Sequence, residues 1–188
     1  MNEPWKISLF GGLSASRGET RITRFRTQKN AALLAFLAYH LDRSHPREVL
    51  IDLLWPDHEI EAGRNCLSVA LSSLRSQFEG PDVPARTVIV ADRASVRLNP
   101  DTVTTDVRDF RRQLSNAAKS VNAAEKTMLL DAAVSLFAGP LLPGFYEEWV
   151  SGQQNHLTEL FFQALETLVA GARSRGDLAE AINYARRD

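Results

Sequence analysis

The sequence has little cysteine, no long apolar run and no strong charge of one sign. Its single cysteine, Cys66, excludes an internal disulfide and any metal site built from several cysteines. No apolar stretch approaches the roughly 18 residues that a membrane-spanning helix needs. The N-terminus, MNEPWK, lacks the charged and then apolar pattern of a secretory signal. We therefore expect a cytoplasmic protein with no membrane partner.

The charges of the chain nearly cancel. The sequence has 22 Lys and Arg against 23 Asp and Glu, and a formal net charge of −1. Residues 1–100 hold 13 basic and 11 acidic side chains, a net charge of +2, whereas residues 101–188 hold 9 and 12, a net charge of −3. This balance excludes a strongly basic DNA-binding protein and predicts only modest non-specific affinity for nucleic acid.

The sequence also lacks the usual signatures of catalysis. Gly11-Gly12 has no third glycine and no following helix, so it is not a phosphate-binding loop, and no Ser/His/Asp set stands out. The four histidines have no metal-ligand spacing, so we expect surface or capping roles for them. They are His40, His45, His58 and His156. We therefore expect no enzyme, no catalytic residues, no metal and no cofactor.

The most informative stretch is a pair of consecutive helices with an acidic turn between them. The first covers 47–55, with Ser44 or His45 as its cap, and the second covers 61–78. The second helix carries an apolar stripe of Leu67, Leu71, Leu74 and Phe78. Such a stripe fixes a helix to its domain and leaves the polar face for the major groove, which is the pattern of a helix-turn-helix.

The flanking segments predict the rest of a winged helix. Residues 7–10 alternate as a strand, and 13–16 and 19–22 predict a hairpin. A helix over 27–41 follows, with Thr27 as its cap. After the helix over 61–78, which Gly80, Pro81 and Pro84 terminate, the runs 87–90 and 95–98 flank a polar turn and predict a second hairpin, the wing. Residues 1–99 are thus expected to form an α+β winged helix-turn-helix domain.

Beyond Asn99-Pro100-Asp101 only helical patterns appear. We expect helices over 107–114, 124–137, 147–172 and 178–187. In the first domain, we expect Trp55 to be a core residue. The tetratricopeptide pattern fits Leu168, Ala172, Gly176, Asp177 and Ala181. A single repeat cannot bury both of its faces. Residues 100–188 are therefore expected to form an all-α, tetratricopeptide-like domain that is cut inside a longer array. We accordingly expect the chain to be the N-terminal piece of a longer protein.

Three short motifs resemble a known family. Leu54-Trp55-Pro56-Asp57, Arg64-Asn65 and Leu74-Arg75 resemble the OmpR-type winged helix of SARP-type regulators (antibiotic regulatory proteins). The apolar turn and tryptophan-bearing helix of 141–150 resemble the bacterial transcriptional activation domain that follows it in this family. The resemblance implies a sequence-specific transcription activator that reads the major groove with the helix 61–78 and uses the wing 87–98. Its implied partners are double-stranded promoter DNA, with direct repeats, RNA polymerase and a second copy in a homodimer.

The candidate DNA-binding residues lie on the helix 61–78 and on the wing. They are Arg64, Asn65, Ser68, Ser72, Ser73, Arg75, Arg93 and Arg97. Arg64 near a helix N-terminus suits a phosphate, or it pairs with Glu61. Serine specifies no base strongly. Arg75 either contacts DNA or pairs inside its domain, and Arg93 either enters the minor groove or stays on a solvated turn.

A second interpretation remains open at this point. The winged helix could have lost DNA binding, so that both domains act as protein-interaction surfaces in a signalling regulator. The near-zero net charge and the serine-rich outer face of the helix 61–78 favour this scaffold reading.

Overall fold

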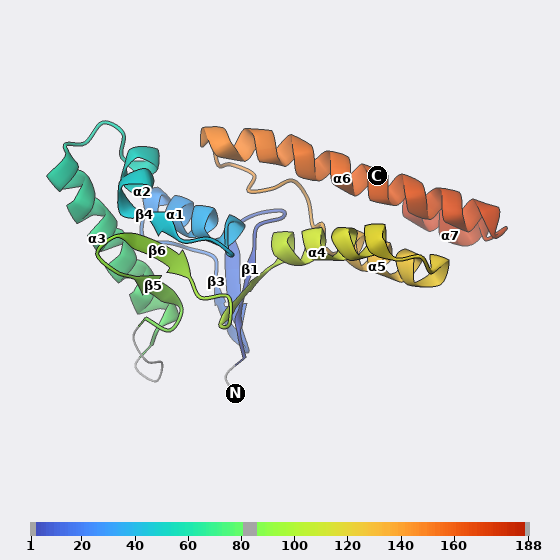
Figure 1. Ribbon diagram of the computed structural model, residues 1–188, viewed down its shortest axis with the longest axis horizontal. Helices are drawn as coiled ribbons and strands as arrows, with labels where there is room; N and C mark the ends of the chain where they lie inside the picture. Colours follow the sequence, from blue (N-terminus) through green and yellow to red (C-terminus); the bar gives the residue numbers. More distant parts are fainter. Residues whose placement is uncertain (1–2, 81–85, 187–188) are drawn as a thin grey trace. The chain divides into compact units, whose positions relative to one another are not determined.

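The computed structural model describes residues 3–80 and 86–186 and divides the chain into two compact units (Figure 1). The winged unit consists of the chain up to Ser8 and of Leu13–Thr105, and the helical unit consists of Leu9–Gly12 and the chain from Asp106 on. The sequence analysis expected one boundary after residue 99. The predicted terminators Pro81 and Pro84 and the predicted helix end at Arg187 lie outside the described residues.

The first sheet of the winged unit has the order β3-β2-β1-β7. Strands β1 (Trp5–Ser8), β2 (Ser14–Arg17) and β3 (Thr20–Ile22) pair antiparallel, and β7 (Val103–Thr105) pairs parallel with β1. The expectation that only helices follow residue 101 was therefore wrong. Three residues are too few to show a strand period, and the partner of β7 lies at the opposite end of the unit's sequence.

Three helices of the winged unit pack on one another, and the periodicity of the sequence located all of them. They are α1 (Gln28–Tyr39), α2 (Arg47–Leu54) and α3 (Ile60–Phe78). Thr27 caps α1 as expected, because its hydroxyl oxygen accepts the Asn30 N–H at 3.1 Å. The expected apolar stripe of α3 is buried, and so is Trp55 at the end of α2. The apolar side of α3 thus fixes which of its residues face outward.

A second sheet, of order β4-β6-β5, carries the wing. Its strands are β4 (His45–Pro46), β5 (Ile89–Ala91) and β6 (Ser95–Leu98). Strand β4 was not expected, because two residues carry no period. Pro46 precedes α2 without any side-chain capping bond, so the expected caps Ser44 and His45 were wrong.

His45 is buried, which corrects the expected surface or capping role. It pairs with Val96 across β4 and β6, and this pairing turns its ring inward, 4.9 Å from the ring of Phe36 and 5.4 Å from that of His40. Burial lowers the pKa of His45, and the charge of Arg43 lowers it further. His45 is therefore part of the packing beneath the wing.

The helical unit contains α4 (Asp106–Lys119), α5 (Ala123–Leu136), α6 (Glu148–Ser174) and α7 (Leu178–Ala185), and each packs on the next (Figure 1). Helix α6 runs unbroken through Gly152 and Gly171. The ring of Phe137 stacks on that of Phe161 at 4.1 Å. On α7, Ala181 is buried whereas Leu178 and Ile182 are 65% and 52% exposed, so part of its apolar face is bare, as expected.

The loop Leu9–Gly12 is held by the carboxylate of Asp106 at the start of α4. The Leu9 and Phe10 N–H groups donate to this carboxylate at 2.9 and 3.0 Å, and the Val107 N–H at 2.8 Å. The Leu142 N–H donates to the Leu9 oxygen at 2.8 Å. Burial raises the pKa of Asp106 to about 6, and the hydrogen bonds from the backbone oppose that rise.

Over residues 3–80 and 86–186, no helix is both long and apolar enough to cross a membrane.

Candidate nucleic-acid interface

After the first turn of α3, where Ile60, Glu61 and Ala62 are exposed, the outward face of the helix is polar except at Val69. The exposed residues of this face are Arg64, Asn65, Ser68, Val69, Ser72 and Ser76. They lie opposite the buried leucines, because residues three and four apart share one side of a helix. Four of the six were expected as DNA-binding residues, whereas Val69 and Ser76 were not. The face offers small side chains that allow another surface to approach closely.

A groove of about 530 Å³ lies between α3 and the wing. Its lining residues are Arg47, Ser68, Leu71, Arg75, Arg86, Ala91, Asp92 and Arg93. Four arginines and one aspartate give the groove a positive charge, although the whole chain is nearly neutral. Arg47 and Arg86 were not among the expected DNA-binding residues. The pairing of β4 with β6 brings Arg47 to this groove, and Arg86 lines it from the segment before β5.

Arg47, the first residue of α2, links α3 to the wing. Its Nη2 donates to the Ser68 hydroxyl oxygen at 3.2 Å, and its Nη1 donates to the Asp92 carbonyl oxygen at 3.4 Å. Its own N–H donates to the Ala94 oxygen at 2.9 Å. Arg47 therefore holds the wing turn at a fixed place beside the outward face of α3.

Two of the expected DNA-binding residues are engaged inside the winged unit. Nε and Nη2 of Arg75 donate to the Ile89 carbonyl oxygen at 3.4 and 3.2 Å, which ties α3 to β5. The Ser73 hydroxyl oxygen accepts the side-chain N–H of Asn30 at 2.9 Å, which ties α3 to α1. Arg75 was expected either to contact DNA or to pair inside its domain, and these hydrogen bonds correspond to pairing inside the domain.

Arg64 is paired with acidic neighbours. Its Nη1 lies 2.7 Å from a carboxylate oxygen of Glu61, and its Nη2 lies 3.8 Å from one of Glu48. All three side chains are about half exposed or more, so these ion pairs contribute little to stability. The Arg64 guanidinium can therefore exchange these partners for another anion at small cost.

The wing turn is built around Asp92. Its carboxylate accepts the N–H groups of Ser95 and Ala94 at 2.7 Å each, and these bonds lower the pKa of Asp92. Arg93 is exposed at this turn and lines the groove. Arg97 lies on β6 opposite Val90, is half-buried and does not line the groove. The wing thus presents Arg93, and not Arg97, beside α3.

A second groove, of about 470 Å³, borders the other side of α3. Its lining residues are Arg26, Val69, Ser72, Ser73, Ser76 and Gln77. The Gln77 side-chain N–H donates to the Arg24 carbonyl oxygen at 3.3 Å, so the segment before α1 is held against α3. Sequence reasoning missed Arg26, although Arg24-Phe25-Arg26 directly before an expected helix was a usable signal. The outward face of α3 therefore has an arginine-lined groove on each side.

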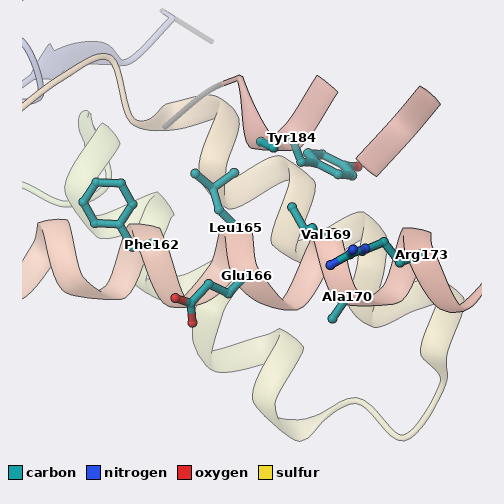
Figure 2. Close-up of a pocket in the computed structure, with 8 residues that line it drawn as sticks. Phe162, Leu165, Glu166, Val169, Ala170, Arg173 and Tyr184 are labelled. Atoms are coloured by element: carbon teal, nitrogen blue, oxygen red, sulfur yellow. The ribbon is translucent and has the colours of Figure 1, made fainter. Parts of the chain in front are cut away.

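A third hollow lies within the helical unit, between α6 and α7, and measures about 580 Å³. Figure 2 shows Phe162, Leu165 and Val169 along α6, with Tyr184 from α7 beside them. Burial raises the pKa of Tyr184 to about 12, helped by the charges of Asp131 and Glu180. The hollow is mostly apolar, and among the described residues no three metal-ligating side chains gather anywhere.

The fold and the surface of α3 define the class of the chain, a winged-helix module followed by a helical module. Residues 105–188 match the model of the bacterial transcriptional activator domain family, so this part of the chain is similar to that family. No curated protein sequence matches the chain.

A solved structure shares the fold of nearly the whole chain. It is Mycobacterium tuberculosis EmbR in complex with a low-affinity phosphopeptide, with a TM-score of 0.82 and 23% identity. The match covers 96% of this chain and 48% of that one, so the chain spans about half the length of EmbR. The expected fold class, a winged helix followed by a helical domain, is confirmed, as is the resemblance to SARP-type regulators.

Proposed function

We propose that the chain is the DNA-binding part of a SARP-type transcription regulator, in which α3 enters the major groove and the wing contacts the neighbouring minor groove or backbone. The observation that carries this proposal is the small, polar outward face of α3 between two arginine-lined grooves. The major groove is about 12 Å wide and has phosphates along both sides. A helix that reads bases therefore needs cations on both flanks.

The contacts divide the arginines and the α3 residues by role. Arg93, Arg47 and Arg86 would meet phosphates on the wing side, and Arg26 on the other side. Arg64 would exchange Glu61 for a phosphate near the start of α3. The candidates for base edges are Asn65, Ser68 and Ser72. Arg75 and Ser73 act as positioning residues through Ile89 and Asn30, and Arg97 supports the wing strand.

The role of the helical unit rests on the family match. A bacterial transcriptional activator domain next to a DNA reader supports an activator that recruits RNA polymerase. On direct repeats, two copies would lie head to tail at a spacing of one helical turn, as in a homodimer assembled on DNA. Such a regulator works where the bacterial chromosome is, in the cytoplasm.

A second candidate, the non-DNA-binding scaffold, is favoured by one set of contacts. Arg64 forms ion pairs with Glu61 and Glu48, and the Arg75 guanidinium donates its hydrogen bonds to the Ile89 carbonyl oxygen. In this case the winged unit would bind protein and would show no preference for a nucleic acid.

Duplex binding at several salt concentrations separates the two candidates. Fluorescence anisotropy of the 188-residue chain on a random labelled duplex should give an affinity that falls steeply with salt. Replacing both Arg26 and Arg93 by Ala should lower the slope by about one per lost phosphate contact. Arg112→Ala, which removes an exposed arginine of α4, is the matched control and should leave the slope unchanged. Binding that is absent, or equally salt-dependent in all variants, would favour the scaffold.

A further inference from the structure

Val69 is an apolar side chain among the polar residues of the outward face of α3. It is 53% exposed at the centre of the outward face of α3, whereas the large apolar residues that follow it, Leu71, Leu74 and Phe78, are at most 3% exposed. A β-branched residue on an exposed helix surface lowers helix propensity, and Val69 leaves about half of its surface exposed to solvent. Neither helix propensity nor solubility favours a valine at this position.

The surroundings of Val69 are those of a reading surface. Asn65 lies one turn earlier on the same face, and Ser72 and Ser76 lie on the turns that follow. Within residues 3–80 and 86–186 the Asn65 side chain makes no hydrogen bond, so its amide is available. Val69 also lines the groove that contains Arg26, where a phosphate backbone would lie.

We infer that Val69 recognises the 5-methyl group of a thymine, and that Asn65 recognises an adenine close to it. This inference rests on the proposed DNA binding by α3. The thymine methyl is the one apolar group that a base pair presents in the major groove, and asparagine pairs in a bidentate manner with N6 and N7 of adenine. The preferred site therefore contains an A and a T at fixed separation.

Helix geometry sets that separation. Four residues of an α-helix rise about 6 Å, and successive bases of one strand are about 3.4 Å apart. Asn65 and Val69 therefore reach bases within about two steps of each other.

The other side chains of this face do not supply the same discrimination. The Ser68 hydroxyl donates to the Arg64 carbonyl oxygen at 2.8 Å and accepts from Arg47. Ser72 and Ser76 are small and bond to any base without strong preference. The specificity of α3 thus falls on Asn65 and Val69, while the serines allow close approach.

The test begins with a duplex that the protein itself selects. The 188-residue chain is used to enrich binding sequences from a random pool, and each thymine of the enriched duplex is then replaced by deoxyuridine, which removes only the methyl group. At one thymine the wild-type chain should bind about fourfold more weakly after the replacement, the loss expected for one apolar carbon. Val69→Ala should bind the thymine and deoxyuridine duplexes equally.

Val49→Ala is the matched control, because Val49 is 49% exposed on α2. This variant should keep the fourfold preference for thymine. Asn65→Ala should likewise lose the preference for adenine over 7-deazaadenine, which lacks the N7 acceptor.

The outcomes separate this inference from the proposed function. A pool that yields no enriched sequence would overturn both. An enriched duplex in which no thymine responds to deoxyuridine, or a Val69→Ala chain that keeps the response, would overturn the role of Val69 and leave DNA binding intact.

Discussion

The indole Nε1 of Trp5 donates a hydrogen bond of 3.2 Å to the carbonyl oxygen of Phe78, and the two rings meet edge-on with centroids 4.8 Å apart. Both side chains are almost fully buried. The contact joins the first strand to the last turn of α3. The direction of the helix that we propose to read DNA is therefore fixed in part by the beginning of the chain.

Trp5→Phe should remove this hydrogen bond and leave a small cavity. Because the Phe78 oxygen is then buried without its indole donor, we expect the free energy of unfolding to fall by about 1–3 kcal/mol. Urea denaturation followed by circular dichroism measures the change. A loss below about 0.5 kcal/mol would mean that the contact does not hold α3 in place.

Leu71→Ala tests the burial of the apolar side of α3. Leu71 is 3% exposed, so its truncation should cost about 2–5 kcal/mol. Val69→Ala, two residues away on the outward face, is the internal control and should change stability by less than about 0.5 kcal/mol. Equal losses in thermal melts of the two variants would contradict the orientation of the helix.

At Gly63, α3 lies close to Ile51 of α2. A Cβ atom at this position would collide with the side-chain Cγ2 of Ile51. Gly63→Ala should therefore destabilise the winged unit by about 1–3 kcal/mol, although alanine is the better helix former. In a double-mutant cycle, Gly63→Ala with Ile51→Ala should cost less than the sum of the single changes, because Ile51→Ala removes the colliding methyl. Strict additivity would place the strain elsewhere.

The pH dependence of stability should reveal Asp106. Its pKa in the folded chain is about 6, above the ordinary value of 3.8, because burial disfavours the charged form. The unfolded chain therefore releases the proton first, and the contribution of this group to stability is complete below about pH 4 and declines up to about pH 6. The decline amounts to about 3 kcal/mol.

Asp106→Asn supplies the comparison for this effect. Asparagine does not ionise, so the difference in unfolding free energy between wild type and variant should change over that pH range and stay constant above it. Denaturation at intervals of half a pH unit measures it. A difference that is independent of pH would contradict the raised pKa of Asp106.

The parts of the structure that the sequence predicted are those with a long period. The stripe of Leu67, Leu71, Leu74 and Phe78 located α3 and its faces because it repeats over about three turns. Strands β4 and β7 are too short for any period, and their partners are distant in sequence. The groove between α3 and the wing was missed for the same reason, since the pairing of β4 with β6 brings Arg47 to the wing turn. Whether Arg75 pairs inside its domain depends on its distance from the Ile89 carbonyl oxygen, and a sequence pattern does not give such a distance.

The parallel pairing of β1 with β7 has a consequence for synthesis on the ribosome. Strand β1 emerges before the rest of the winged unit, yet its partner Val103–Thr105 emerges only at the end of that unit. The partners of the next residues, Leu9–Gly12, are synthesised even later, because these residues pair with Pro140, Leu141 and Leu142. Contacts between such distant segments form slowly. Strand β1 and Leu9–Gly12 are thus made long before their distant partners, and a nascent chain released at residue 99 would carry an open sheet edge at β1.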